Sequence, residues 1–172
     1  AYEDKPRMAY WLKANDIPHP ETWIFFNKKE ALDFARSCSL PIVSKTNFGA
    51  SGTGVKIIRD RNQLKRLIKN AFGRGVCPDG MDLRDRQWGN ILLQEYLPDV
   101  KEWRMVRIGN SYFGHAKGKA GDYHSGSGIA VWDVPEEKHL NLLHHVTEKG
   151  HFKSMDVDIF EFNGKLLVNE IQ

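Results

Sequence analysis

The pattern of hydrophobic and polar positions predicts a mixed α+β chain of short helices and strands. Apolar residues recur at helical spacing in four places: residues 4–14, and the segments that follow Asn27, Asp60 and Pro135. Asn27, with Glu30 three residues on, and Asp60 are expected to cap the helices that follow them. Runs rich in β-branched, aliphatic and aromatic residues predict strands at 22–26, 40–45, 55–59, 91–97, 103–108 and 112–119. Residues 73–90 break this pattern with Gly, Pro, Asp and Arg, so we expect an excursion there with one short helix.

The last stretch, residues 155–172, predicts a β-hairpin. It reads MDVDIFEFNGKLLVNEIQ, in which Asn163-Gly164 separates two apolar runs. Asn-Gly between such runs is the strongest short-range signal for a hairpin turn. We therefore expect two antiparallel strands at the end of this sequence.

The register of this hairpin decides where its polar side chains point. A two-residue turn with an uninterrupted ladder pairs Phe162 with Lys165 and sends Glu170 to the face opposite Asp158. A three-residue loop or a β-bulge instead brings Asp158, Glu170 and Gln172 onto one face. We favour this second register, in which carboxylate and amide oxygens form a site suited to magnesium. The alternative is that these groups only line the wet face of a sheet.

A glycine-rich loop at residues 47–54, NFGASGTG, lies between two predicted strands and follows Lys45. Glycines allow positive φ, so the backbone N–H groups of such a loop can approach an anion. The loop matches neither GxxxxGK[ST] nor GxGxxG, and no helix follows it directly. We interpret it as a mobile flap that contacts phosphate, with a flexible hairpin tip as the alternative.

Two acidic residues lie near the strand predicted at residues 91–97: Glu95 near its end and Glu102 after it. Glu95, in QEYLP, could present its carboxylate and main chain to a planar base, and Glu102 could accept hydrogen bonds from sugar hydroxyls. Glu95 could equally cap a sheet edge. These residues alone leave both alternatives open.

Cationic side chains on the next two strands are candidates for binding phosphate. Arg104 and Arg107 are three apart and therefore point to opposite faces of a strand, whereas Arg104 shares a face with Glu102. Lys117 and Lys119 also share one face. Cations beside a carboxylate-bound metal are what phosphoryl transfer requires, although each could be ordinary surface charge.

Composition narrows the classes of protein that fit. The 172 residues suit one domain of ordinary size, and the net charge of +3 is scattered, which argues against nucleic-acid binding. Two cysteines without framework spacing favour a reducing cytoplasm, with Cys38 in the core. No run is long enough to span a membrane, and no histidine or cysteine spacing indicates zinc.

Taken in order, these motifs resemble the ATP-grasp fold, and in particular D-alanine ligases and ribosomal-protein glutamate ligases. The resemblance rests on the opening DK and helix, PIVSK with NFGASGTGV, LLQEYLP, Glu102, and the closing DVDIFEFNGKLLVNEIQ. It implies an α+β fold of two lobes of mainly antiparallel sheet with helices, and nucleotide bound between them. Residues 1–94 would form the small lobe with the DK helix and glycine loop, and residues 95–172 the large lobe with the metal hairpin.

The resemblance also implies a role for each matching residue. Phosphate contacts would come from Lys5, Lys45, Gly49, Ser51, Gly52 and Gly54. Adenine would be held by Glu95, Tyr96 and Leu97, and ribose by Glu102. Magnesium would be held by Asp158, Glu170 and Gln172, the last standing where the family commonly has Asn. Arg104, Lys117 and Lys119 would stabilise the transferring phosphoryl group.

The implied reaction is a magnesium-dependent ligation. ATP phosphorylates a substrate carboxylate, and an amine then displaces phosphate to form an amide. We expect ATP and Mg²⁺ as cofactors, a small-molecule or peptide carboxylate and an amine as substrates, and no nucleic-acid or membrane partner. The alternatives are a nucleotide-binding regulatory module without ligase chemistry and a kinase acting on a hydroxyl. Because family members usually have a domain before the DK helix and a segment after the metal strand, we expect a longer protein.

Overall fold

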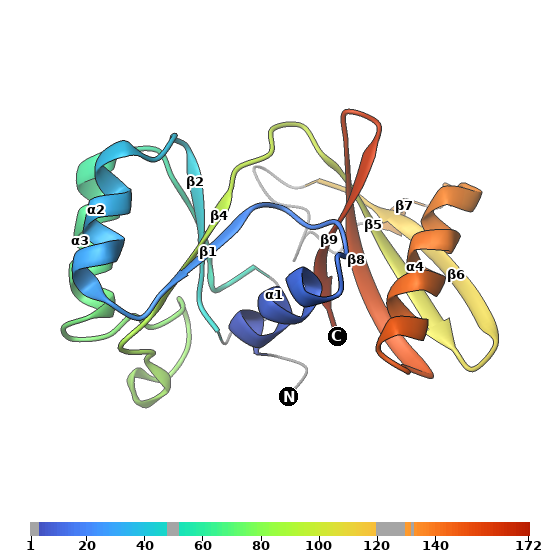
Figure 1. Ribbon diagram of the computed structural model, residues 1–172, viewed down its shortest axis with the longest axis horizontal. Coiled ribbons are helices and arrows are strands. Elements are labelled where there is room, and N and C mark those ends of the chain that lie inside the picture. The colour runs from blue at the N-terminus through green and yellow to red at the C-terminus, as the bar shows by residue number, and fades with distance from the viewer. Residues whose placement is uncertain (1–3, 48–51, 120–129, 132) are drawn as a thin grey trace. The chain divides into compact units, whose positions relative to one another are not determined.

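The computed structural model describes residues 4–47, 52–119, 130–131 and 133–172, and it contains two antiparallel sheets (Figure 1). The chain divides into two compact units. We call residues 4–6 and 21–96 the small unit, and residues 7–20 and 97–172 the large unit. Residues 7–20 group with the large unit although they precede the small unit in the sequence. The expected division between residues 94 and 95 stays a prediction.

The small unit is a four-stranded sheet with two helices on one face (Figure 1). The strands, in spatial order, are β1 (Thr22–Phe25), β4 (Ile91–Glu95), β2 (Ile42–Lys45) and β3 (Val55–Ile58). The helices are α2 (Lys28–Ser37) and α3 (Arg61–Ala71). Ala31, Ile42, Leu64, Ile68 and Leu93 are among the buried residues that pack together between sheet and helices.

Side chains cap both helices of the small unit, as the sequence predicts. The Oδ1 atom of Asn27 accepts hydrogen bonds from the backbone N–H groups of Lys29 (2.8 Å) and Glu30 (3.3 Å). The carboxylate of Asp60 accepts from the N–H of Gln63 at 2.7 Å. These bonds satisfy first-turn donors that have no partner within the helix.

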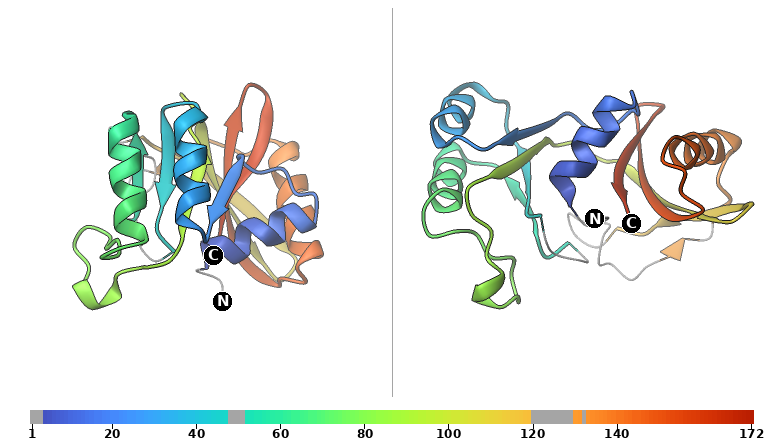
Figure 2. Two further views of the ribbon diagram at one scale, coloured as in Figure 1. Left: turned by 60° about the vertical axis from the view of Figure 1, so that its left-hand side comes forward. Right: turned by 60° about the horizontal axis from the view of Figure 1, so that its bottom comes forward.

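The large unit is a five-stranded antiparallel sheet. Its strands, in spatial order, are β7 (Ala130–Val131), β6 (Ser111–Lys117), β5 (Lys101–Ile108), β8 (Ser154–Phe162) and β9 (Lys165–Ile171). Helix α4 (Glu137–Lys149) lies along one face (Figure 2). The sequence did not predict β7, because two residues carry no usable alternation of polar and apolar side chains.

One face of the five-stranded sheet carries the apolar core. Trp103, Met105, Val157 and Ile159 point to this face and pack with Leu143 of α4. Leu12 of α1 (Lys5–Ala14) and Ile17 belong to the same cluster, which explains why residues 7–20 group with the large unit. The other face of the sheet therefore receives the alternate, polar residues of the same strands.

Arg107 is an exception on the core face, where it is buried and paired. Its guanidinium donates to Thr147 Oγ1 at 2.9 Å and forms an ion pair with Glu148 at 2.5 Å, both on α4. Arg104, three residues earlier, points to the opposite face and bonds to Asp158. The prediction that the two arginines lie on opposite faces is confirmed.

The core face also holds a bonded carboxylate, Glu161, which makes stability depend on pH. Glu161 accepts hydrogen bonds from Lys138 (2.5 Å) and Trp103 (3.2 Å). Burial raises its pKa, but these hydrogen bonds outweigh burial and hold the pKa below the ordinary value of 4.5. Because the folded pKa is depressed, the stabilisation is present above the unfolded pKa and is lost as pH falls through the folded pKa.

We therefore expect Glu161→Gln to flatten the acid side of the stability profile. Thermal unfolding of the wild type and variant, followed between about pH 6 and pH 3, measures this difference. The variant should lose less melting temperature than the wild type over that range. Parallel curves would show that Glu161 is not a source of the acid sensitivity.

None of the helices in the described part of the chain is long and apolar enough to cross a membrane.

Candidate active site

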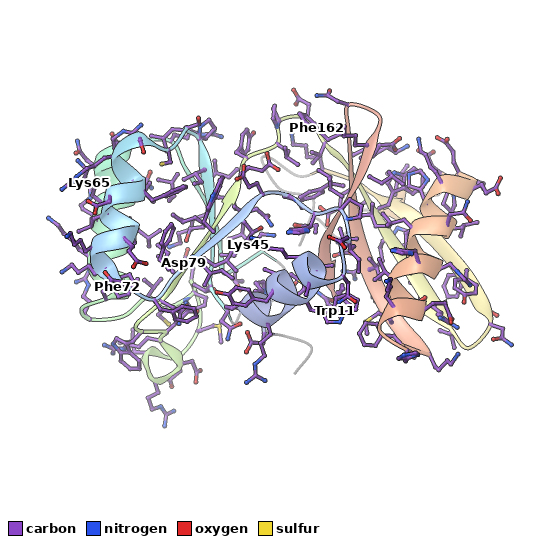
Figure 3. The ribbon with its side chains drawn as sticks, viewed as in Figure 1. Trp11, Lys45, Lys65, Phe72, Asp79 and Phe162 are labelled. Carbon is purple, nitrogen blue, oxygen red and sulfur yellow. The ribbon has the colours of Figure 1, made fainter. Side chains whose placement is uncertain are left out.

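The closing hairpin combines a two-residue turn with a β-bulge. Phe162, labelled at the end of β8 in Figure 3, pairs with Lys165 across the turn. The ladder continues in that register to Ile159 and then shifts, so that Asp158 faces Glu170. Asn169 is the extra residue on β9. The favoured register, with Asp158 and Glu170 on one face, is confirmed.

The same register shift also places Gln172 on the face of the hairpin that carries the two carboxylates. The backbone of Gln172 exchanges hydrogen bonds with Asp156 at 2.8 and 2.9 Å. Residues opposite each other share a face, as do residues two apart on one strand. Asp156, Asp158, Glu170 and Gln172 therefore lie on one face of the hairpin. Asp156 was missed in the sequence, although its spacing of two from Asp158 is the signal for it.

A row of polar residues crosses the sheet at the level of Asp158. Asp158 pairs with Arg104 on β5, and Arg104 pairs with His115 on β6. With Glu170 on β9, the row spans four neighbouring strands on the face away from the core. His115 is a second candidate that sequence reasoning did not single out, because only strand pairing places it beside Arg104.

Four charged side chains on this face form a compensated network. Arg104 donates to both oxygens of Asp158, from Nε to Oδ1 and from Nη2 to Oδ2, each at 3.0 Å. Lys117 bonds to Asp158 Oδ2 and also donates to Glu102 Oε1 at 2.7 Å. Glu102 is only 2% exposed and Asp158 3%. Two buried anions are thus balanced by two cations.

This network stabilises the protonated guanidinium of Arg104. The hydrogen bonds with Asp158 raise the pKa of the guanidinium above its ordinary value, although burial opposes the effect. The nearby charges of Asp158, Asp156 and Glu102 raise it further. A cation held in this way is pre-oriented on the polar face.

Two predicted residues of the large unit occupy different environments. Lys119 lies beyond the end of β6, where its amine is exposed and 4.0 Å from Asp99, so it is not part of the buried network. Glu102 is part of that network, and its carboxylate bonds to Lys117. The ribose role of Glu102 stays a prediction.

In the small unit, Lys5 and Lys45 are both buried, each 8% exposed. Lys45, labelled in Figure 3, ends β2 immediately before the glycine loop. The base of that loop is closed by a hydrogen bond from the Thr46 N–H to the Gly54 carbonyl at 2.9 Å. Gly52 has a φ of 81°, a conformation that favours glycine. Gly49 and Ser51 lie outside the described residues.

Glu95 has a structural role at the edge of β1. Its carboxylate accepts a hydrogen bond from the N–H of Glu21 at 2.7 Å, and its own N–H donates to the Glu21 carbonyl at 2.9 Å. The next residue, Tyr96, packs its ring under the guanidinium of Arg59, 5.9 Å from the ring centre. The sheet-edge alternative is therefore observed, and adenine binding by Glu95, Tyr96 and Leu97 stays a prediction.

The polar face offers oxygen donors that fit magnesium. Among the described residues, no three His, Cys, Asp or Glu side chains cluster closely enough to hold a metal ion by themselves. Asp158 and Glu170 face each other across the hairpin, however, and magnesium in nucleotide sites needs only one or two carboxylates besides phosphate and water. Asp158 Oδ1 accepts one hydrogen bond and Oδ2 two from described residues, and a carboxylate has about four acceptor positions.

Comparison with solved structures identifies the fold. The chain aligns with the RimK-domain ATP-grasp protein of Sphaerobacter thermophilus over 98% of its length and 58% of that chain, with a TM-score of 0.72 and 17% identity. It aligns over 99% of its length and 55% of that chain with D-alanyl-alanine synthetase A of Vibrio cholerae, with a TM-score of 0.65 and 17% identity. The fold is that of ATP-grasp proteins, and the α+β expectation is confirmed.

Sequence comparison then gives the family. Residues 4–102 match the family described as the carbamoyl-phosphate synthase L chain, ATP binding domain, and this protein belongs to that family. The carbamoyl phosphate synthase large chain of Archaeoglobus fulgidus is 32% identical over 100 residues, which is 58% of this chain and 8% of the relative.

Two further relatives have different names. The 2-oxoglutarate carboxylase small subunit of Hydrogenobacter thermophilus is 26% identical over 111 residues, covering 63% of this chain and 22% of the relative. The coenzyme gamma-F420-2:alpha-L-glutamate ligase of Methanocaldococcus jannaschii is 30% identical over 110 residues, covering 61% and 33%. This chain thus matches a third or less of the length of these relatives.

Proposed function

We propose that this protein is an ATP-dependent ligase that joins a carboxylate to an amine. The observation that carries the proposal is the bulge in the closing hairpin, which turns Asp158 and Glu170 to one face beside Arg104 and Lys117. Facing carboxylates together with cations are what transfer of a phosphoryl group from magnesium-ATP needs. Membership of an ATP-binding domain family supports the choice of nucleotide.

Asp158, Glu170 and Gln172 would hold magnesium. Magnesium held by these residues would supply positive charge that offsets the charge on the nucleotide phosphates. The ion pairs of Asp158 suggest how the network responds when nucleotide binds, because nucleotide phosphates also attract Arg104 and Lys117. We expect both cations to shift part of their bonding from Asp158 to phosphate, which leaves the carboxylate more able to accept a cation.

The chemistry itself needs two displacements. A carboxylate oxygen of the substrate attacks the γ-phosphorus of ATP and ADP leaves, which gives an acyl phosphate. The nitrogen of the amine then attacks the acyl carbon, phosphate leaves, and the nitrogen loses a proton to give the amide. Arg104, Lys117 and Lys119 are the cations we assign to the phosphoryl group, and the protein contributes positioning and charge stabilisation rather than a covalent nucleophile.

The nucleotide would be held by residues of the small unit and by Glu102. We assign its phosphates to Lys5, Lys45 and the glycines of the loop, its adenine to the segment 95–97, and its ribose to Glu102. The adenine contact is expected to use the main chain of that segment, because the Glu95 carboxylate is already bonded to Glu21. A reducing cytoplasmic location, consistent with two free cysteines, is part of this proposal.

Release of ADP and phosphate tests the reaction class. The full-length protein is supplied with magnesium-ATP and a panel of carboxylic acids and amines, singly and in pairs. We expect release above background only when one acid and one amine are both present, together with an amide product of matching mass. Nucleotide binding without turnover would instead indicate a regulatory module, and a phosphorylated hydroxyl product without amine consumption would indicate a kinase.

A further inference from the structure

The excursion at residues 73–90 is folded onto the small unit. Val76 and Gln87 exchange backbone hydrogen bonds at 2.9 and 2.8 Å, which closes the segment into a loop around η1 (Leu83–Asp85). The N–H of Gly89 donates to the Ala71 carbonyl at the end of α3 at 2.9 Å. Asp79, labelled in Figure 3, forms an ion pair with Lys56 of β3 at 3.3 Å. The segment therefore bonds to the end of α3 through its backbone and contacts β3 through an exposed ion pair.

The side chain of Gln87 reaches from this segment to the base of the glycine loop. Its Oε1 atom accepts a hydrogen bond from the backbone N–H of Asn47 at 2.6 Å. Its Nε2 atom donates to Asn90 Oδ1 at 2.7 Å, immediately before β4. The backbone of Gln87 is paired with Val76, and the bond to Asn90 orients the amide so that Oε1 faces the Asn47 N–H.

Asn47 also forms a hydrogen bond with a second segment, the start of α1. It lies two residues after Lys45, and its Oδ1 atom accepts the backbone N–H of Lys5 at 2.8 Å. Lys5 is the first residue of α1, where N–H groups have no acceptor within the helix. One residue thus ties the main chain after Lys45 to the main chain of Lys5, and both lysine side chains are buried.

We propose that Gln87 is a positioning residue for the nucleotide-binding lysines, and that residues 73–90 hold the main chain at Asn47, two residues after Lys45. The inference rests on the proposed function, because Lys5 and Lys45 are there assigned to nucleotide phosphates. Gln87 is assigned no contact with substrate or cofactor and acts through its hydrogen bond with Asn47. The linked hydrogen bonds from Gln87 to Asn47 and from Asn47 to Lys5 set the spacing of Lys5 and Lys45, which come from distant parts of the sequence.

Two substitutions separate the effect of the acceptor atom from the effect of side-chain size. Gln87→Met keeps the length of the side chain but removes the acceptor for the Asn47 N–H. Gln87→Glu keeps the acceptor and loses the donor to Asn90. The matched control is Arg86→Met, because the contacts of Arg86 with described residues lie within the excursion: hydrogen bonds to the carbonyls of Leu83 (2.6 Å) and Arg74 (3.3 Å), and its guanidinium over the ring of Trp88. All variants are made in the full-length protein.

Two readouts are measured on these variants: the Kd for magnesium-ATP by calorimetry and the exchange rate of the Asn47 amide by NMR. We expect Gln87→Met to raise both by about tenfold, since a partly buried N–H loses its acceptor. Gln87→Glu should recover most of the wild-type value in both, and Arg86→Met should leave both near wild type. If Gln87→Met does not fold, Asn90→Ala takes its place, with an expected rise of about threefold because the amide of Gln87 is then held at one end only.

The outcomes separate this inference from the function on which it rests. A wild-type protein that binds no nucleotide would remove the proposed function and the role of Gln87 with it. A wild-type protein that binds nucleotide, with an unchanged Kd in Gln87→Met, would overturn the positioning role and leave the ligase proposal intact. Equal effects of Arg86→Met and Gln87→Met would show that the excursion acts through general stability, which also overturns the inference.

Discussion

Asp158→Asn is expected to lower amide formation on the order of a thousandfold or more, because it removes a charged oxygen donor from the proposed magnesium site. It also leaves Arg104 and Lys117 with one buried anion, Glu102, in place of two. Breaking a buried pair costs about 3–5 kcal/mol, and we expect the lower end because the Arg104 side chain is one-third exposed and can turn to water. Steady-state kinetics and chemical denaturation measure the two effects separately.

Two neighbours on β8 serve as comparisons for Asp158→Asn. Glu161→Gln lies on the core face of the same strand and should change stability without a large loss of turnover in the folded variant. Asp156→Asn lies on the polar face, opposite Gln172. If Asp156→Asn abolishes turnover while Asp158→Asn does not, the magnesium assignment moves from Asp158 to Asp156.

The second large effect is expected from a pair of arginines on β5. Arg104→Met should lower turnover by about a hundredfold, because it removes a pre-oriented cation from the polar face. Arg107→Met should instead cost about 1–3 kcal/mol of folding stability through lost hydrogen bonds to α4, with turnover reduced less than about threefold. The measurements are kcat at saturating substrates and the free energy of unfolding.

This pair is a stringent comparison because the two residues have the same chemistry and lie three positions apart on one strand. They differ in the face of the sheet on which they lie, and with it in exposure and partners: Arg104 is 33% exposed and bonds to Asp158, whereas Arg107 is 3% exposed and pairs with Glu148. Equal losses of turnover in Arg104→Met and Arg107→Met, at equal stability, would show that the polar face has no special part in the reaction. The proposed site would then have to be abandoned.

Local features of this fold could be predicted well from the sequence. The caps at Asn27 and Asp60, the turn at Asn163-Gly164 and the short helix in the excursion all depend on residues within a few positions of each other. Alternation on a strand also placed Arg104 and Arg107 correctly on opposite faces. Hydrogen bonds and side-chain directions over such short distances follow from the backbone geometry of one segment.

Partners from distant segments could not be predicted in the same way. The sequence indicated both Glu95 and Lys117 as charged candidates, but it did not show that Glu95 bonds to Glu21 or that Lys117 lies between Glu102 and Asp158. It identified residues 73–90 only as a long connection, whereas the structure shows that Gln87 reaches Asn47. These contacts join residues 15 to 74 positions apart.

By itself, the sequence determined which residue types are available on this protein's strands and where its helices begin and turns occur. Tertiary structure alone decided that a bulge at Asn169 brings Asp158 opposite Glu170, and that Arg104 and Lys117 hold Asp158. The reason is that a one-residue shift in a ladder reverses the face of every later side chain while leaving local propensities almost unchanged. Such a shift is fixed by how the whole hairpin packs against its neighbours.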